Sequence, residues 1–183
     1  MNYTSLEEVY AANDAIREKL KQTVTSLPAD TLHARPEGEK WSIAEIVEHV
    51  SMVNAGVVRI CAKLLSKAEA DGKLSNGVLS ISTEFIANAT GSTDVKLEAP
   101  EMVQPVAGAS VEESFGVLDT NHTALSALRE KFEKFDGCDP KFPHPYFGDL
   151  SAQEWLALSG GHEFRHLRQI KRLIEKLALD GPE

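Results

Sequence analysis

Cysteine, long apolar runs and basic targeting residues are scarce in this 183-residue sequence. Its only cysteines, Cys61 and Cys138, are too few for a disulfide framework. No apolar run approaches the ~20 residues that a bilayer-spanning helix needs. The first residues, MNYTSLEEVY, lack the basic and apolar regions of a signal peptide. These absences argue against a membrane protein, and we expect a cytoplasmic location.

Positive charge is also in short supply. The chain has 19 Lys and Arg against 28 Asp and Glu, which gives a formal net charge of −9. An acidic chain repels phosphate backbones, so we expect no nucleic-acid partner. Hydrophobic residues make up 42% of the chain, as is ordinary for a globular protein. The length suits one domain with a real core, and we expect a single domain over 1–183.

Four segments carry the signature of a helix start. In a capping box, Ser or Thr stands three residues before Glu, and the two side chains satisfy free backbone N–H groups. The four boxes begin at Ser5, Ser42, Ser110 and Ser151. Apolar residues of helical period follow each box, and each pattern ends at a Pro or Gly stop signal. The predicted helices cover about 5–27, 42–71, 110–136 and 151–180.

Each predicted helix has one apolar stripe, and packing four such stripes together predicts an all-α four-helix bundle. Residues 28–41 and 137–150 have the composition of loops, whereas 72–109 form a long crossover between the second and third helices. A crossover this long could return the chain along the bundle, so these two helices could run parallel. Within it, VLSIST at 78–83 could form a strand fragment, and a short helix around 81–89 is equally compatible.

Two histidines interrupt the apolar seam of the last helix. His162 and His166 continue the stripe of Trp155 and Leu158, and they stand four residues apart on one face. Buried neutral imidazoles need hydrogen-bonding partners, and one metal ion would satisfy a nitrogen of each. The alternative is a pair of core histidines bonded to other side chains.

A metal site needs a third ligand from another helix. His49, on the flank of the second apolar stripe, is the best candidate. His122 lies on the seam of the third helix and could be a fourth ligand, a hydrogen-bonding residue of the pocket or a structural residue. We expect His33, in the first loop, and His144, among prolines, to be loop residues without a ligand role.

The last-helix pair also has the H-E-x-x-H spacing of zinc metallopeptidases, in which Glu163 would be the general base. The context of such a site is missing. Gln169 and Arg172 stand where the extended motif has Gly and His, and only 17 residues follow His166, too few for a ligand from a further helix. The metallopeptidase is therefore a remote alternative. Glu163 would otherwise be a pocket residue that supports the metal ligands, or a solvent-exposed or rim carboxylate.

Several residues near the predicted site have a plain alternative explanation. Glu45 lies one turn before His49 and could support it, but its place in the capping box already explains it. Asn121 could hydrogen-bond a substrate, but a polar helix face explains it equally well. Gly160 and Gly161 would allow a bend or a close helix approach, at a cost of about 1 kcal/mol each in helix propensity.

Two stretches together resemble the DinB-like superfamily of metal-binding four-helix bundles. WSIAEIVEH at 41–49 follows W-S-x-x-E-x-x-x-H, and HEFRHLRQI at 162–170 follows H-x-x-x-H-x-x-Q-I. The similarity covers nearly the whole chain. It implies a bundle with up-down-down-up connections and a divalent metal held by His49, His162 and His166.

The resemblance also implies a class of activity. Three neutral imidazoles leave a divalent ion an open position, which is typical of catalytic rather than closed structural zinc. Imidazole suits several metals, of which Zn or Ni is expected here. Some members of the family use low-molecular-weight thiols. This implies a metal-dependent S-transferase that acts on a small thiol and an electrophile, in which the metal generates the thiolate.

The alternative is a non-enzymatic metal-binding or stress-response protein with a structural site. Packing of exposed bundle faces would allow a homodimer.

Overall fold

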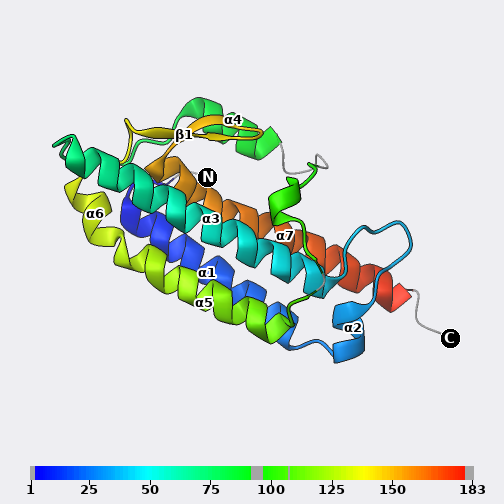
Figure 1. Cartoon of the computed structure of the whole chain (residues 1–183). Coiled ribbons are helices and arrows are strands. Elements are labelled where there is room, and N and C mark those ends of the chain that lie inside the picture. The colour runs from blue at the N-terminus through cyan, green and yellow to red at the C-terminus, as the bar shows by residue number, and fades with distance from the viewer. Residues whose placement is uncertain (1–2, 92–96, 107, 180–183) are drawn as a thin grey trace.

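The computed structural model describes residues 3–91, 97–106 and 108–179. Within them, four long helices lie side by side: α1 (Leu6–Thr25), α3 (Ile43–Ala70), α5 (Val111–Ala127) and α7 (Ala152–Leu179). Figure 1 shows α1 and α7 running in one direction and α3 and α5 in the other. The predicted up-down-down-up four-helix bundle is therefore confirmed.

Shorter elements fill the connections between the long helices. They are α2 (Ala29–His33), α4 (Thr83–Gly91), the 3-10 helix η1 (Glu101–Val103), α6 (Arg129–Lys134), β1 (Lys141–His144) and β2 (Gly148–Ser151). For the crossover, the short-helix alternative is confirmed by α4. The predicted third helix is divided at Leu128, between α5 and α6.

Residues 137–150 are not simply a loop. They contain most of an antiparallel hairpin in which Phe142 is paired with Leu150. The turn at Gly148 has φ of +72°, a conformation that favours glycine. The hairpin and α4 together lie over the start of α7 and the C-terminal half of α3 (Figure 1).

The helix starts follow the predicted capping chemistry with one exception. Ser42 and Ser110 form complete capping boxes with Glu45 and Glu113. Ser151 and Glu154 also exchange both bonds, at 2.9 and 3.2 Å. At the first helix, Ser5 accepts from the Glu8 backbone, but the Glu8 carboxylate bonds the Thr4 backbone N–H instead of that of Ser5.

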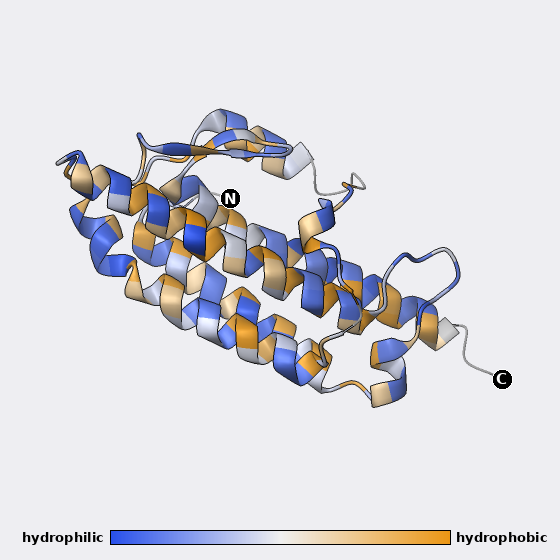
Figure 2. Ribbon diagram, viewed as in Figure 1, coloured by the Kyte–Doolittle hydropathy of each residue, from blue (hydrophilic) through white to orange (hydrophobic). Residues whose placement is uncertain are grey.

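Hydrophobic residues recur along one side of each long helix, as Figure 2 shows, and their buried side chains form two clusters among the described residues. One cluster lies at the end of the bundle that holds Val9, Leu65 and Leu156, and the other at the end that holds Leu20 and Ile170. Polar side chains lie buried between the two clusters. The core is therefore divided by a polar layer.

The centre of that layer is an ion pair between Arg17 of α1 and Glu163 of α7. Arg17 Nε donates to Glu163 Oε2 at 2.8 Å, and its NH2 group donates to Oε1. Arg17 NH1 also donates to the Leu118 carbonyl of α5, while Asn54 of α3 donates to Glu163 Oε1 at 3.0 Å. This polar layer therefore joins all four long helices. Removing one partner of a buried ion pair costs about 3–5 kcal/mol.

The burial of Glu163 corrects one expectation. Its side chain is only 2% exposed, so it is not a solvent-exposed or rim carboxylate. The partner that allows this burial, Arg17, lies 146 residues earlier in the chain. A buried carboxylate is stable only when paired and hydrogen-bonded, and both conditions are met here.

No described helix has the length and apolarity needed to cross a membrane.

Helices α1 and α7 approach closely at Gly160. A Cβ atom at this position would lie 2.0 Å from Oδ1 of Asn13 and 3.4 Å from its Cα. Asn13 is held in place because its Nδ2 donates to the Leu156 carbonyl at 3.0 Å. The expectation of a close helix approach is confirmed.

We predict that Gly160→Ala lowers the free energy of unfolding by about 1–2 kcal/mol. Overpacking costs about 1–3 kcal/mol, and the better helix propensity of Ala offsets at most about 1 kcal/mol of it. The matched control is Gly116→Ala in α5, where a Cβ meets no atom within 4 Å. That variant should be unchanged or slightly more stable. Urea denaturation measures both, and equal stabilisation by the two substitutions would refute the close approach.

Candidate metal centre

Three histidines from two helices converge in the half of the bundle that holds Leu20 and Ile170. His49 comes from α3, and His162 and His166 from α7. One nitrogen of each ring lies within 4.8 Å of the others. His49 is about 10 Å from the start of its helix and the α7 pair about 15–21 Å from the start of theirs. The antiparallel helices meet at these positions because α7 extends past the beginning of α3 (Figure 1).

Hydrogen bonds at the outer nitrogens orient two of the rings. His49 Nδ1 lies 2.7 Å from the Val103 carbonyl oxygen of η1. His166 Nδ1 lies 2.9 Å from Oε1 of Gln169, one turn later on α7. Both partners are acceptors, so each Nδ1 carries the proton and donates it. The Nε2 atoms of His49 and His166 therefore present lone pairs to the interior of the cluster.

The inner nitrogens are arranged as metal ligands require. His162 Nε2 lies 3.3 Å from His49 Nε2 and 3.1 Å from His166 Nε2. A proton on His162 could satisfy one of these two lone pairs but not both. Tetrahedral zinc with Zn–N bonds of 2.0–2.1 Å separates its nitrogen ligands by about 3.3 Å, close to these spacings. The donor set and its spacing therefore fit a divalent metal ion.

The protein environment keeps the three rings neutral. Burial, followed by the neighbouring His166 and His49, lowers the pKa of His162 well below its usual value. Burial also lowers the pKa of His166 to about 3 and depresses that of His49. Neutral imidazole is the form that binds metals, so at neutral pH no proton has to be displaced from the inner nitrogens of His49 and His166.

His122, the predicted candidate for a fourth ligand, lies outside the cluster. Its Nε2 faces Asp14 of α1 at 3.6 Å, on a side chain that is 37% exposed. Among the residues that the structure describes, the group that could hold an ion consists of His49, His162 and His166 alone. A fourth position at this group would therefore be left to a small molecule.

The other predicted pocket residues serve the bundle. Asn121 donates to the Ser51 carbonyl at 3.3 Å and so links α5 to α3. The Glu45 carboxylate caps α3 and accepts two bonds from Arg35, at 2.7 and 2.8 Å. Glu163 is fully engaged by Arg17 and Asn54 and is not available as the general base of a metallopeptidase.

One aromatic ring outside the cluster lies against it, a contact that the sequence did not indicate. The centre of the Trp41 ring lies 4.8 Å from that of His49. His144, expected in a loop, lies on β1, where its ring centre is 4.5 Å from that of Phe147, on which it stacks, and 5.2 Å from that of Trp155. The apolar run FPHPYF was the one available signal of the hairpin, and its prolines indicated a loop instead.

Comparison with known proteins places these features in a wider group. The family model for the DinB superfamily matches residues 12–170. The uncharacterised protein YuaE of Bacillus subtilis (strain 168) is 26% identical over 157 residues, which cover 82% of this chain and 88% of YuaE.

Two solved structures share the fold. TT2238, described as a four-helix bundle protein, has a TM-score of 0.59 and 23% identity, over 91% of this chain and 98% of its own. YfiT from Bacillus subtilis, described as a probable metal-dependent hydrolase with an unusual four-helix bundle topology, has a TM-score of 0.59 and 16% identity, over 94% and 87%. At these identities the likeness establishes the arrangement of the helices.

The lowered pKa values predict acid sensitivity of the metal-free protein. Below pH ~6.5 the histidines of the unfolded chain bind protons that the folded cluster does not, so stability is fully present above that pH and is lost as pH falls toward the folded pKa values. Each ring contributes up to about 1.4 kcal/mol per pH unit. Urea denaturation between pH 7.5 and 5 should give a shallower slope for His166→Gln and an unchanged slope for the control His33→Gln. Equal slopes for parent and His166→Gln would contradict this expectation.

Proposed function

The chain belongs to the DinB superfamily, and from this premise we propose that it is a metal-dependent enzyme whose divalent ion is held by His49, His162 and His166. One observation carries the proposal. Three neutral imidazoles direct their inner nitrogens to a common point, and hydrogen bonds to Val103 and Gln169 hold two of them in that tautomer. A cation between the three nitrogens would satisfy their lone pairs at once, whereas a proton on His162 satisfies only one of its two neighbours.

We propose Zn or Ni as the metal; imidazole nitrogen is a ligand that both accept, as Cu and Fe also do. Gln169 and the Val103 carbonyl increase the basicity of the two rings they hold and prevent them from turning away. When bound, the ion would supply Lewis acidity toward a small molecule at the position that the protein leaves open.

We propose a small thiol as that molecule: it would lose its S–H proton to solvent, and its sulfur would form a bond to the carbon of an electrophile, which releases its leaving group. Hydrolysis usually needs a carboxylate or histidine to manage the proton of water. Glu163 is the nearest carboxylate along α7, and it is bound by Arg17 and Asn54. A thiol, whose usual pKa is about 8.5, loses its proton more readily than water and needs no such base.

Hydrolysis is the second candidate, because YfiT has the same helix arrangement and is described as a probable metal-dependent hydrolase. A non-enzymatic role, in which the ion only joins α3 to α7, is the third. The three candidates differ in what a chelator removes: a thiol-dependent rate, a hydrolytic rate, or stability alone.

We predict that His162→Ala abolishes stoichiometric metal binding, since its ring lies between the other two. The matched control is His122→Ala, whose ring pairs with Asp14 outside the cluster and should leave binding intact. Metal content after dialysis, with calorimetric titration of Zn and Ni, measures both. Full occupancy in purified His162→Ala would remove the basis of the proposed site.

We also predict turnover between a small thiol and an electrophile such as 1-chloro-2,4-dinitrobenzene in the metal-loaded protein. The rate should fall to background on chelation and in His166→Ala, and it should return when metal is restored to the parent. Nitrophenyl esters tested in parallel report hydrolysis. A chelator-sensitive ester rate without a thiol-dependent one would favour the hydrolase. The absence of both rates, with metal still bound, would favour the non-enzymatic role.

A further inference from the structure

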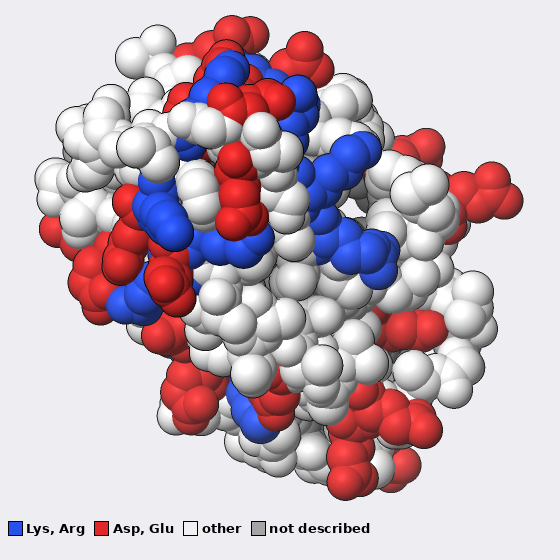
Figure 3. Space-filling view, turned by 60° about the vertical axis from the view of Figure 1, so that its left-hand side comes forward, with Lys and Arg blue, Asp and Glu red and all other residues white. Residues whose placement is uncertain are grey.

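A groove between α3 and α7 leads away from the three histidines, beneath the hairpin. On α3, Gly56 and Lys63 follow His49 at intervals of seven residues and so lie on nearly the same side of the helix, whereas Arg59, one turn before Lys63, lies on its exposed side. A Cβ atom at Gly56 would meet no atom within 4 Å, so the space above this part of α3 is open. Figure 3 shows a hollow in the surface, with Lys and Arg side chains gathered beside it.

Contacts connect α3 to the hairpin above this groove. Lys63 Nζ lies 5.1 Å from the ring centre of Phe142 on β1, so the lysine extends toward the hairpin. Trp155 Nε1 of α7 donates to the Phe142 carbonyl at 3.3 Å, and the Trp155 ring contacts His144. A ligand beneath the hairpin would therefore lie beside Lys63, on the side of α3 that also presents His49.

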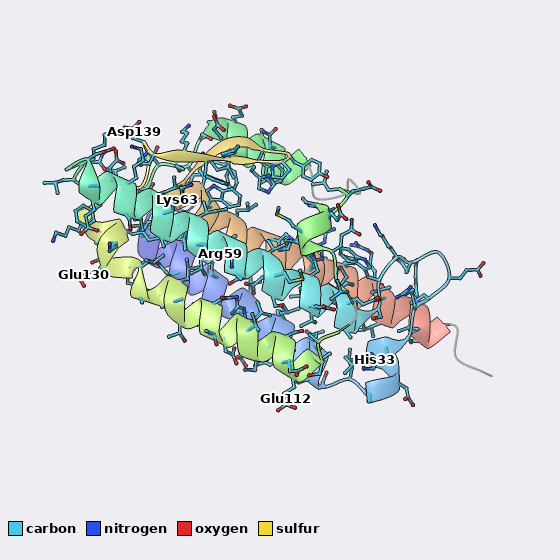
Figure 4. All side chains as sticks on the ribbon, viewed as in Figure 1. His33, Arg59, Lys63, Glu112, Glu130 and Asp139 are labelled. Carbon is cyan, nitrogen blue, oxygen red and sulfur yellow. The ribbon has the colours of Figure 1, made fainter. Side chains whose placement is uncertain are left out.

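Neither cation has an acidic partner among the described residues. Arg59 is exposed and makes no hydrogen bond or ion pair with them, while Lys63 contacts the Phe142 ring. They stand four residues apart, one turn of α3, and Figure 4 shows Lys63 on the hairpin side of α3 and Arg59 farther from the hairpin. Two adjacent unpaired cations repel each other unless an anion lies between them.

Acidic residues are absent from three stretches beside this groove, although the chain as a whole carries 28 of them. There is none between residues 49 and 68 on α3, between 155 and 162 on α7, or between 141 and 148 in the hairpin. Glu98 and Glu101 belong to the segment that contacts Tyr146 and His49. In a chain with a net charge of −9, the three stretches together carry only positive charge, which attracts anions and repels cations.

We propose that Arg59 and Lys63 form an anion-binding subsite, so that the thiol substrate is one that carries a carboxylate or phosphate group. The second part of this inference, that the ligand is a thiol, rests on the proposed function. Arg59 is about 15 Å of helix rise from His49. A ligand whose sulfur reaches the cluster must therefore extend several bonds beyond the sulfur to bring its anionic group to the subsite.

The probes are glutathione and its dimethyl ester, which have the same reach but differ in their carboxylates. They are titrated into protein loaded with Co(II), whose visible absorption reports sulfur binding.

Arg59→Ala and Lys63→Ala should each weaken glutathione binding about three- to fivefold, and the double variant about tenfold. Arg59→Lys should retain most of the affinity. Lys19→Ala, which removes an exposed cation of α1, is the control and should have no effect. Ester binding should be the same in all variants, and coenzyme A tests phosphate in place of carboxylate.

A second readout separates the subsite from the chemistry at the histidines. S-Methylglutathione cannot bind through a thiol, and in metal-free protein it should still quench tryptophan fluorescence through Trp155, with weaker binding in the double variant. If no thiol alters the cobalt spectrum but this quenching persists, the proposed function fails and the subsite stands. If acid and ester bind the parent equally, or if the double variant loses both to the same extent, the subsite is refuted.

Discussion

The ion pair of Arg17 and Glu163 is the constraint on which the metal-binding geometry depends. It lies in the middle of the bundle, where the apolar core is interrupted, and its hydrogen bonds reach α1, α3, α5 and α7. Attraction between apolar stripes is non-directional and therefore specifies the register of the helices less sharply than a hydrogen-bonded pair does. A buried charge tolerates no such displacement, because an unpaired ion in the core is strongly destabilising. Since Glu163 is the immediate neighbour of His162, the pair also sets the rotation of α7 and directs its histidines toward α3.

Local features of the sequence were sufficient to predict the helices. The Ser-x-x-Glu boxes at Ser42, Ser110 and Ser151 locate helix starts because capping involves only residues within one turn. The histidine pair of α7 could be identified for a similar reason, since its spacing places both rings on one face. His49 required an argument about what two buried imidazoles lack, and the structure brings its ring to theirs.

The failures of prediction all concern contacts between distant residues. Glu163 appeared to be a rim carboxylate because nothing near it in sequence reveals Arg17. For His122 the sequence left three roles open, because nothing near it in sequence reveals that its ring lies beside Asp14 of a neighbouring helix. The hairpin was missed because prolines flank His144, and proline is common in edge strands as well as in loops. In each case the deciding partner is supplied by the tertiary fold.

The two outer hydrogen bonds that orient the ligand rings differ in how they respond to sequence change. His166 is held by the side chain of Gln169, so a single codon change can remove that support. His49 is held by the main-chain oxygen of Val103, which every amino acid possesses. Evolutionary drift at position 103 can therefore alter the side chain above the three rings, while the orientation of the His49 ring is inherited unchanged.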